Sequence, residues 1–335
     1  MFDSKIAYVD RGFGFVKAGT RPGERNLVLQ SLIVPGRPMP GFGEQTTMVY
    51  RGQTHLVGRT AARQAGIASQ ADLADDAPVN EESRLLYLAA LAYLARRDGI
   101  TRFKVVAGLP VDTWEASRDR LKQLLLSIRG ETVELQVGDE LIRAVISVED
   151  AMVMPQPLGS ALDFLLDAEG QLQGEREFPA AIGGQHVWPV EAVAGWRWCV
   201  VDIGFNTLNT YVLDDMEPVR RFCTSPKLGM AHAYQIAGRA AGGQGALDVQ
   251  AGLRVFEGAA QMEEAYQEVG RQITRLIRSW NDPSIAFYLV TGGGAYRLFK
   301  HILPGEGAKL LADDAQEANG RGYYKAGVQR WGANG

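Results

Sequence analysis

Two aspartates, Asp10 and Asp202, hold equivalent places in a stretch that the chain contains twice. The first copy reads YVDRGFGFV over residues 8–16, and the second reads VVDIGFNTLNTYV over residues 200–212. In each copy an apolar run leads to the aspartate, and a glycine follows two positions later. This pattern predicts a buried strand that ends in a tight hairpin turn. Carboxylate oxygens bind Mg²⁺ and turn N–H groups bind phosphate, so the two turns favour a metal–nucleotide site.

The repetition carries more weight than either copy alone. An Asp-x-Gly hairpin is a common structural feature, because glycine tolerates the backbone angles of a tight turn. Two copies at this separation suit a duplicated α/β half, with several strands and then alternating helices and strands in each half. The sequence therefore predicts two α/β domains with a cleft between them.

Composition bounds the class of protein. The chain has 335 residues, 46% of them hydrophobic and 22% charged, with a net charge of −4. These values are typical of a soluble globular protein large enough for two cores. Without a long basic block, direct binding of nucleic acid has little support. Two cysteines, Cys199 and Cys223, and no apolar run of membrane-spanning length lead us to expect a cytoplasmic protein without membrane association.

Four further segments organise the chain. Residues 81–97 are apolar enough to predict a buried helix, and residues 261–281 carry a helical apolar stripe. Prolines near residue 155 predict a break followed by a helix that starts near Gly159. We expect an insertion or loops over 167–195 and a short helix over 248–256.

A glycine-rich run, TGGG at residues 291–294, follows a predicted strand and precedes a predicted helix. Glycine lets the backbone lie close to a purine or a phosphate, and a helix N-terminus favours anions. The run lacks G-x-G-x-x-G spacing, and the chain contains no G-x-x-x-x-G-K-[ST] motif. These absences exclude the dinucleotide fingerprint and the P-loop, and a purely structural glycine turn stays open.

At this point the sequence resembles the superfamily of actin, the sugar kinases and the heat-shock chaperone ATPases. Its phosphate loops read DRGFGFVK and DIGFNTLN, and its adenosine loop reads VTGGGAYRLF. Within that superfamily it is similar to the ParM-type (StbA-type) plasmid-segregation actins of bacteria, with their phage and archaeal relatives. The segments VVAGLPVDTW, VMPQPLGSAL and EANGRGYYKAG carry this narrower likeness.

The resemblance implies an α/β, actin-like fold, which is a duplicated ribonuclease H-like two-domain fold with an interdomain nucleotide cleft. Domain I would comprise residues 1–155 and a C-terminal helix about 321–335, with a small lobe about 35–80. Domain II would comprise residues 156–320, with a small lobe about 225–283.

The resemblance also implies roles for individual residues. Asp10 would hold Mg²⁺ through water, Asp202 would face the metal and the attacking water, and Gln156 would orient that water. The other implied nucleotide contacts are Gly12, Phe13, Gly14 and Lys17 in the first loop, Gly204, Phe205, Asn206 and Thr207 in the second, and Gly292, Gly293, Gly294 and Tyr296 near the adenosine.

Three of these residues carry open questions. Lys17 matches a phosphate-side lysine of actin, and a solvated strand lysine is an equal alternative. Gln156 stands where ParM has a catalytic glutamate and actin a glutamine; a glutamine cannot act as a base, so we expect a low hydrolysis rate. Phe205 replaces a glycine of many relatives and narrows the second loop.

The implied function is an ATP-dependent (or GTP-dependent) ATPase with Mg²⁺ that assembles into a head-to-tail filament and drives plasmid or DNA segregation. Its implied partners are further copies of itself and a DNA-binding adaptor of ParR type. One alternative is a small-molecule kinase of the same superfamily, for which Asp163 would be a poor base. The others are a nucleotide-binding scaffold with little hydrolysis and a chaperone-like ATPase.

Overall fold

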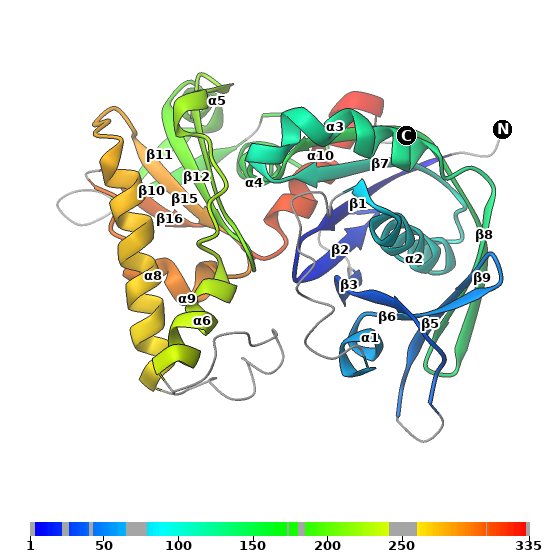
Figure 1. The fold of residues 1–335 in the computed structure, drawn as a ribbon. Helices are drawn as coiled ribbons and strands as arrows, with labels where there is room; N and C mark the ends of the chain where they lie inside the picture. The colour runs from blue at the N-terminus through cyan, green and yellow to red at the C-terminus, as the bar shows by residue number, and fades with distance from the viewer. Residues whose placement is uncertain are drawn as a thin grey trace. The chain divides into compact units, whose positions relative to one another are not determined.

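The computed structural model of the chain describes residues 4–21, 27–39, 43–64, 79–172, 174–179, 185–240, 260–305 and 307–332 (Figure 1). The chain divides into two compact units. Unit 1 contains Met1–Leu109, Thr113–Met154 and Tyr323–Gly335, and unit 2 contains Pro110–Asp112 and Pro155–Gly322. Segments 65–78 and 241–259, which include the expected helix 248–256 and parts of both expected small lobes, lie outside the described residues.

Unit 1 is built on one nine-stranded sheet with the order β3-β2-β1-β7-β9-β8-β5-β6-β4. Its strands are β1 (Lys5–Arg11), β2 (Phe15–Gly19), β3 (Leu27–Gln30), β4 (Ile33–Pro35), β5 (Thr46–Tyr50), β6 (Gln53–Val57), β7 (Arg102–Leu109), β8 (Glu131–Val137) and β9 (Glu140–Pro155). Its helices are α1 (Arg59–Gln64), α2 (Glu81–Asp98), most of α3 (Val111–Leu126) and the C-terminal part of α10 (Ala318–Trp331).

Helix α2 forms the centre of the unit 1 core, as its apolar sequence predicts. It packs against β1, β2, β3, β4 and β8, and most of its residues are buried. Asn80 caps its N-terminus by accepting the N–H of Ser83 at 2.8 Å. Gly99 ends it with a left-handed φ of 68°, which glycine adopts without strain. Local chemistry therefore fixes both ends of the helix.

Unit 2 is built on a five-stranded sheet with the order β14-β13-β12-β15-β16. The strands of this sheet are β12 (Arg197–Ile203), β13 (Leu208–Asp214), β14 (Glu217–Pro218), β15 (Phe287–Thr291) and β16 (Ala308–Leu311). A separate two-stranded sheet contains β10 (Glu175–Pro179) and β11 (Gln185–Pro189). Its helices are α4 (Gln156–Leu165), α5 (Val190–Ala194), α6 (Met230–Ala240), α8 (Ala260–Ser279) and α9 (Ala295–Leu298), with 3₁₀ turns η3 (Arg220–Phe222) and η4 (Phe299–His301).

The apolar stripe expected over 261–281 is confirmed. Helix α8 buries Met262, Val269, Ile273 and Ile277 in the unit 2 core, and α6 lies beside it (Figure 1). On β12 and β15, Trp198 and Phe287 stack with ring centroids 4.8 Å apart.

The two units repeat one strand pattern. In unit 1, β1 pairs antiparallel with β2 and parallel with β7. In unit 2, β12 pairs antiparallel with β13 and parallel with β15. Each Asp-x-Gly stretch thus forms the predicted hairpin, and the duplication read from the sequence is confirmed.

Two expectations need correction. Of the two alternatives for residues 167–195, an insertion or loops, loops alone are wrong, because β10 and β11 form an antiparallel hairpin and α5 follows it. The helix expected near Gly159 begins at Gln156. Pro155 is its N-cap and Pro157 lies in its first turn, where the N–H that proline lacks would have no helical partner. Within the described residues, no helix is both long and apolar enough to cross a membrane.

Helices α4 and α10 approach each other at two glycines. A Cβ added to Gly322 of α10 would overlap the carbonyl oxygen of Gly159 in α4, and would lie 2.9 Å from the backbone nitrogen of Asp163. The opposing atoms belong to the backbone, so they have little freedom to move aside.

We therefore predict that Gly322→Ala lowers the free energy of unfolding by about 1–3 kcal/mol, the usual cost of overpacking. Alanine otherwise stabilises a helix interior relative to glycine. Urea denaturation followed by circular dichroism measures the change. Gln329→Ala, at an exposed position of the same helix, is the control. Gly322→Ala would contradict this packing if it were as stable as the wild type.

Candidate functional site

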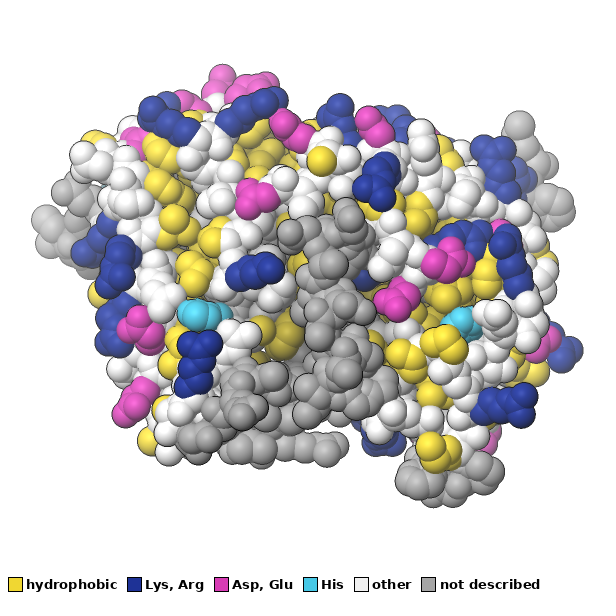
Figure 2. Space-filling model, viewed as in Figure 1, with side chains coloured by type: hydrophobic (Ala, Val, Ile, Leu, Met, Phe, Trp, Pro, Cys, Tyr) yellow, Lys and Arg dark blue, Asp and Glu magenta, His cyan; other side chains and the backbone are white. Residues whose placement is uncertain are grey.

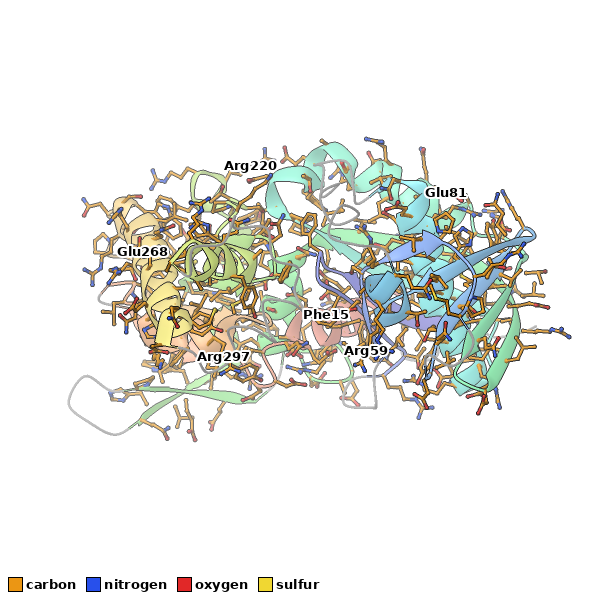
Figure 3. All side chains as sticks on the ribbon, turned by 60° about the horizontal axis from the view of Figure 1, so that its bottom comes forward. Phe15, Arg59, Glu81, Arg220, Glu268 and Arg297 are labelled. Atoms are coloured by element: carbon orange, nitrogen blue, oxygen red, sulfur yellow. The ribbon has the colours of Figure 1, made fainter. Side chains whose placement is uncertain are left out.

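The two Asp-x-Gly turns have the same backbone hydrogen bond. The N–H of Gly12 donates to the carbonyl of Phe15 at 3.0 Å, and the N–H of Gly204 donates to the carbonyl of Thr207 at 2.9 Å. A Cβ on either glycine would lie 3.1–3.2 Å from the oxygen that closes its turn. Both turns are thus too tight to accept a larger residue easily. Phe15, labelled in Figure 3, begins β2 directly after the first turn.

Each turn has two consecutive N–H groups that donate no backbone hydrogen bond within the described part of the chain. Phe13 and Gly14 in the first turn, and Phe205 and Asn206 in the second, donate no backbone hydrogen bond to any residue that the structure describes. Consecutive N–H groups of this kind form anion-binding nests. The two turns can therefore receive phosphate oxygens.

The two aspartates also occupy the same register. Asp10 lies opposite Lys17 in the β1–β2 pair, and Asp202 lies opposite Asn209 in the β12–β13 pair. The Nζ of Lys17 lies 2.9 Å from Oδ2 of Asp10, and both side chains are largely buried. The Nδ2 of Asn209 lies 3.3 Å from Oδ2 of Asp202. A cation therefore faces the first carboxylate and a neutral amide faces the second.

The Asp10 carboxylate fits a water-mediated Mg²⁺ site. Its Oδ1 is buried and accepts no hydrogen bond. An unsatisfied buried carboxylate oxygen is costly, and a metal-bound water would satisfy it. Among the described side chains, no three His, Cys, Asp or Glu residues gather as metal ligands. One or two carboxylates with water and phosphate oxygens are nonetheless the usual protein environment of Mg²⁺.

Burial shifts the pKa values of two side chains near Asp10, Arg11 and Tyr87. The pKa of the Arg11 guanidinium is lowered, chiefly by loss of hydration, with opposing contributions from Tyr87 and Glu82. The pKa of the fully buried Tyr87 phenol is raised, again chiefly by burial, and the nearby Asp10 charge adds to that shift. The phenol therefore stays neutral at physiological pH.

Asp202 lies in a buried polar cluster. Only 3% of Asp202 is exposed, and its Oδ2 accepts the Nδ2 of Asn209 at 3.3 Å and the Nδ2 of Asn319 at 3.1 Å. The same Nδ2 of Asn209 reaches Oε1 of Gln156 at 3.5 Å. The structure thus brings Gln156 and Asp202 together around one amide.

The backbone of the second turn also accepts hydrogen bonds from the N-terminus of α6. The carbonyls of Gly204 and Phe205 accept the N–H groups of Met230 and Ala231 at 3.1 and 2.7 Å, at the start of α6. The Phe205 ring packs against the unit 2 core, 6.4 Å from the ring of Tyr234. Phe205 therefore anchors the turn.

The glycine-rich run packs mostly against its own unit. Gly292 has a φ of +86°, and its added Cβ would overlap Oδ1 of Asp202 and lie 2.5 Å from the carbonyl oxygen of Ile203. The N–H of Gly294 donates to that same carbonyl at 2.9 Å. Gly293 differs, because its nearest neighbour would be the Gln316 side chain at 3.9 Å. Of the three glycines in this run, Gly293 therefore has the most room for a ligand.

The helix after this run is shorter than the sequence suggests. Helix α9 contains four residues, so it provides little of the dipole that a longer helix offers an anion. Tyr296 lies on it, 53% exposed, and its hydroxyl accepts the N–H of Ala315 at 3.0 Å. Arg297, labelled in Figure 3, is the next residue of this helix.

Sequence reasoning missed Asn209 and Asn319 as neighbours of Asp202. One signal was present for Asn209, because it follows Asp202 by seven residues, as Lys17 follows Asp10. Asn319 lies within the EANGRGYYKAG segment but had no assigned role. Ser160, which is a hydrogen-bond partner of Asn319, and Thr291, which is a partner of Ser160, are both buried and also gave no signal in the sequence.

Comparisons with known proteins relate the fold of the chain to that of actin-like proteins. A family model described as the N-terminal domain of actin-like proteins matches residues 9–159. No curated protein matches the chain. A ParM protein from a 15-stranded Clostridium botulinum filament is 18% identical, with a TM-score of 0.73 and coverage of 98% of this chain and 100% of that chain.

Two further solved structures extend the comparison. ParM of Bacillus thuringiensis with ATP is 13% identical, with a TM-score of 0.67 and coverage of 98% of this chain and 99% of that chain. An archaeal actin homologue in complex with ADP is 18% identical, with a TM-score of 0.67 and coverage of 97% and 99%.

The fold is that of actin-like proteins, and residues 9–159 match the family model of their N-terminal domain. More narrowly, its fold over nearly the whole chain is that of the ParM proteins. The identification made from the sequence motifs is confirmed at the level of fold and N-terminal domain.

The glycine-rich run offers a paired test. We predict that Gly292→Ala lowers the free energy of unfolding by about 1–3 kcal/mol, because its Cβ meets Asp202 and its backbone angle is unfavourable for alanine. Gly293→Ala, one residue away and with free space around its Cβ, should have a much smaller effect. Thermal unfolding of the two purified variants checks the difference. Equal losses would contradict the close contact of Gly292 with Asp202.

Proposed function

We propose that the chain binds ATP with Mg²⁺, hydrolyses it slowly, and assembles into a head-to-tail filament whose stability depends on the bound nucleotide. The observation that carries the proposal is the duplicated turn. Each copy has two N–H groups that are unpaired among the described residues, and they follow a buried carboxylate in the chain; each unit contains one copy. The solved ParM structures with ATP and in a filament support the assignment by likeness of fold.

In each turn, some residues would bind phosphate and a glycine would shape the backbone. Phe13 and Gly14, with Lys17, would bind phosphate in unit 1, and Gly12 would shape that turn. In unit 2, Phe205, Asn206 and Thr207 would bind phosphate, with Gly204 as the shaping residue. Gly292, Gly293, Gly294 and Tyr296 would lie near the adenosine, with Gly293 offering the room.

Asp10 and Asp202 would hold Mg²⁺ through water, and the bound ion would neutralise phosphate charge. Gln156 would orient the attacking water by hydrogen bonding, because an amide has no useful basicity at neutral pH. Asn209 would hold Gln156 beside Asp202. Hydrolysis with this set would be slow, since no described group near Gln156 replaces a catalytic glutamate.

The kinase alternative loses support in the structure. Its candidate base, Asp163, forms an ion pair with Arg321, whose Nη2 lies 2.6 Å from Oδ2 and whose Nε reaches both carboxylate oxygens. Both oxygens of this carboxylate already accept hydrogen bonds from Arg321, so the carboxylate is poorly placed to take a proton from a substrate. A scaffold with little turnover stays as the second candidate, favoured by Gln156.

We also propose that the protein works in the cytoplasm in plasmid or DNA segregation, through a DNA-binding adaptor of ParR type. Figure 2 shows basic and acidic side chains interspersed on the face in view, and the net charge of the chain is −4. A separate DNA-binding partner fits this distribution better than a basic surface of the chain itself.

Light scattering provides the main test. Right-angle scattering of the purified protein should rise when ATP–Mg²⁺ is added and should fall as phosphate is released. Asp202→Ala should bind ATP and assemble, yet release phosphate far more slowly, so its scattering should persist longer. ATP binding without any rise in scattering would overturn the filament proposal. Unchanged phosphate release by Asp202→Ala would overturn the role of Asp202.

Gln156→Glu tests the position of the attacking water. A carboxylate at this position keeps the hydrogen bond from Asn209 and adds a base, so we predict faster turnover with nearly unchanged affinity for ATP. Phosphate release and fluorescent nucleotide binding measure the two quantities. Gln329→Glu makes the same chemical change at an exposed position and is the control. A tenfold loss of affinity, about 1.4 kcal/mol, would show that Gln156 contacts the nucleotide instead.

A further inference from the structure

Asn319 uses both ends of its side-chain amide. Its Nδ2 donates to Oδ2 of Asp202 at 3.1 Å. Its Oδ1 accepts the backbone N–H of Ser160 at 3.2 Å and the Ser160 hydroxyl at 2.6 Å. A carboxylate only accepts and a backbone N–H only donates, so the amide has one possible orientation. Asn319 therefore joins Asp202 on β12 to Ser160 on α4.

Asn209 makes a second connection of the same kind. Its Nδ2 lies 3.3 Å from Oδ2 of Asp202. Its Oδ1 accepts the Ser225 hydroxyl at 2.7 Å and the backbone N–H of Val111, the first residue of α3, at 3.4 Å. Asn209 thus joins Asp202 to the N-terminus of α3.

These connections reach every place where the chain passes from one unit to the other. The passages lie at residues 109–113, at 154–155 and at 322–323. Helix α3 begins at the first passage, α4 begins at the second, and α10 contains the third. A single asparagine side chain therefore links each of the three helices to Asp202: Asn209 links α3, and Asn319 links α4 and lies on α10 itself.

Two further buried hydrogen bonds support the Asn319 connection. The hydroxyls of Ser160 and Thr291 lie 2.9 Å apart, and Thr291 donates to the carbonyl of Ala315 at 3.1 Å. Thr291 is the register partner of Asp202 in the β12–β15 pair. All these side chains are buried, so breaking one hydrogen bond leaves an unsatisfied polar group.

We propose that Asn209 and Asn319 are positioning residues that couple the carboxylate of Asp202 to the three passages between the units. An amide is rigid and planar, so a movement of Asp202 that displaces Nδ2 also displaces Oδ1 and its partners. Occupation of the nucleotide site would then change how stably the backbone of α3, α4 and α10 is hydrogen-bonded at the passages. This inference rests on the proposed function of Asp202.

Hydrogen exchange on the full-length chain tests the coupling. In the wild type, ATP–Mg²⁺ should change exchange at residues 110–116, 156–165 and 318–326. Asn319→Ala should lose the change at the last two segments, and Asn209→Ala should lose it at the first. Phosphate release at saturating ATP should fall about 10- to 100-fold in Asn319→Ala, with a much smaller effect on ATP affinity. Asn319→Ala with wild-type exchange responses and turnover would overturn the proposal.

Two variants separate coupling from a general loss of stability. Thr210→Val removes a fully buried hydroxyl from the residue after Asn209 on β13, where it donates to the carbonyl of Phe222 at 3.0 Å. This control should keep all nucleotide responses. Ser160→Ala leaves Asn319 in place and serves if Asn319→Ala does not fold. It should weaken the response of α4 alone, and an unchanged α4 response would count against the proposal.

A nucleotide-free measurement distinguishes failure of this inference from failure of the proposed function. If the wild type shows no response to ATP–Mg²⁺, the proposed function is wrong, and the coupling is judged without ligand. Asp202→Ala, Asn319→Ala and the double variant then form a cycle, with exchange of α4 as the readout. Non-additive changes support the coupling, and additive changes overturn it.

Discussion

The structure of unit 2 depends on the hydrogen bonds that one buried carboxylate, that of Asp202, must receive. Asp202 ends a strand inside the core, where an unpaired charge would be very costly. Two asparagine amides meet this requirement, one from the neighbouring strand and one from the last helix. Each amide then needs partners for its own oxygen. The helices that carry those partners are consequently fixed around the carboxylate, and so is the residue proposed to orient water.

Close backbone contacts set the remaining geometry of unit 2. Gly292 and Gly294 let the loop after β15 lie against the end of β12, and the carbonyls of the second turn bind the start of α6. Gly322 similarly lets α10 approach α4. These contacts leave no space for a Cβ, so they define positions more sharply than side-chain packing does. They hold the second turn and the glycine-rich run as one rigid frame.

The two copies of the turn differ in their electrostatics. In unit 1 the cationic side chain of Lys17 lies against Asp10, whereas in unit 2 the amide of Asn209 holds the equivalent place beside Asp202. Asp10 keeps one unsatisfied oxygen. A duplicated backbone thus supports two chemically distinct carboxylates. In the described part of either unit, no three His, Cys, Asp or Glu side chains gather as metal ligands.

The sequence by itself determined the features that depend on near neighbours. Hairpins at Asp10 and Asp202, the buried helix α2 and the apolar face of α8 follow from local periodicity and turn chemistry, and the repeat revealed the duplicated fold. Only the tertiary structure decided which side chains meet Asp202. Asn319 and Ser160 are 159 residues apart, and the register of β13 brings Asn209 into place. The β10–β11 hairpin was missed because it is mostly exposed: Phe178 is the one buried residue of the two strands, so they show no alternation of apolar and polar residues that a local pattern could reveal.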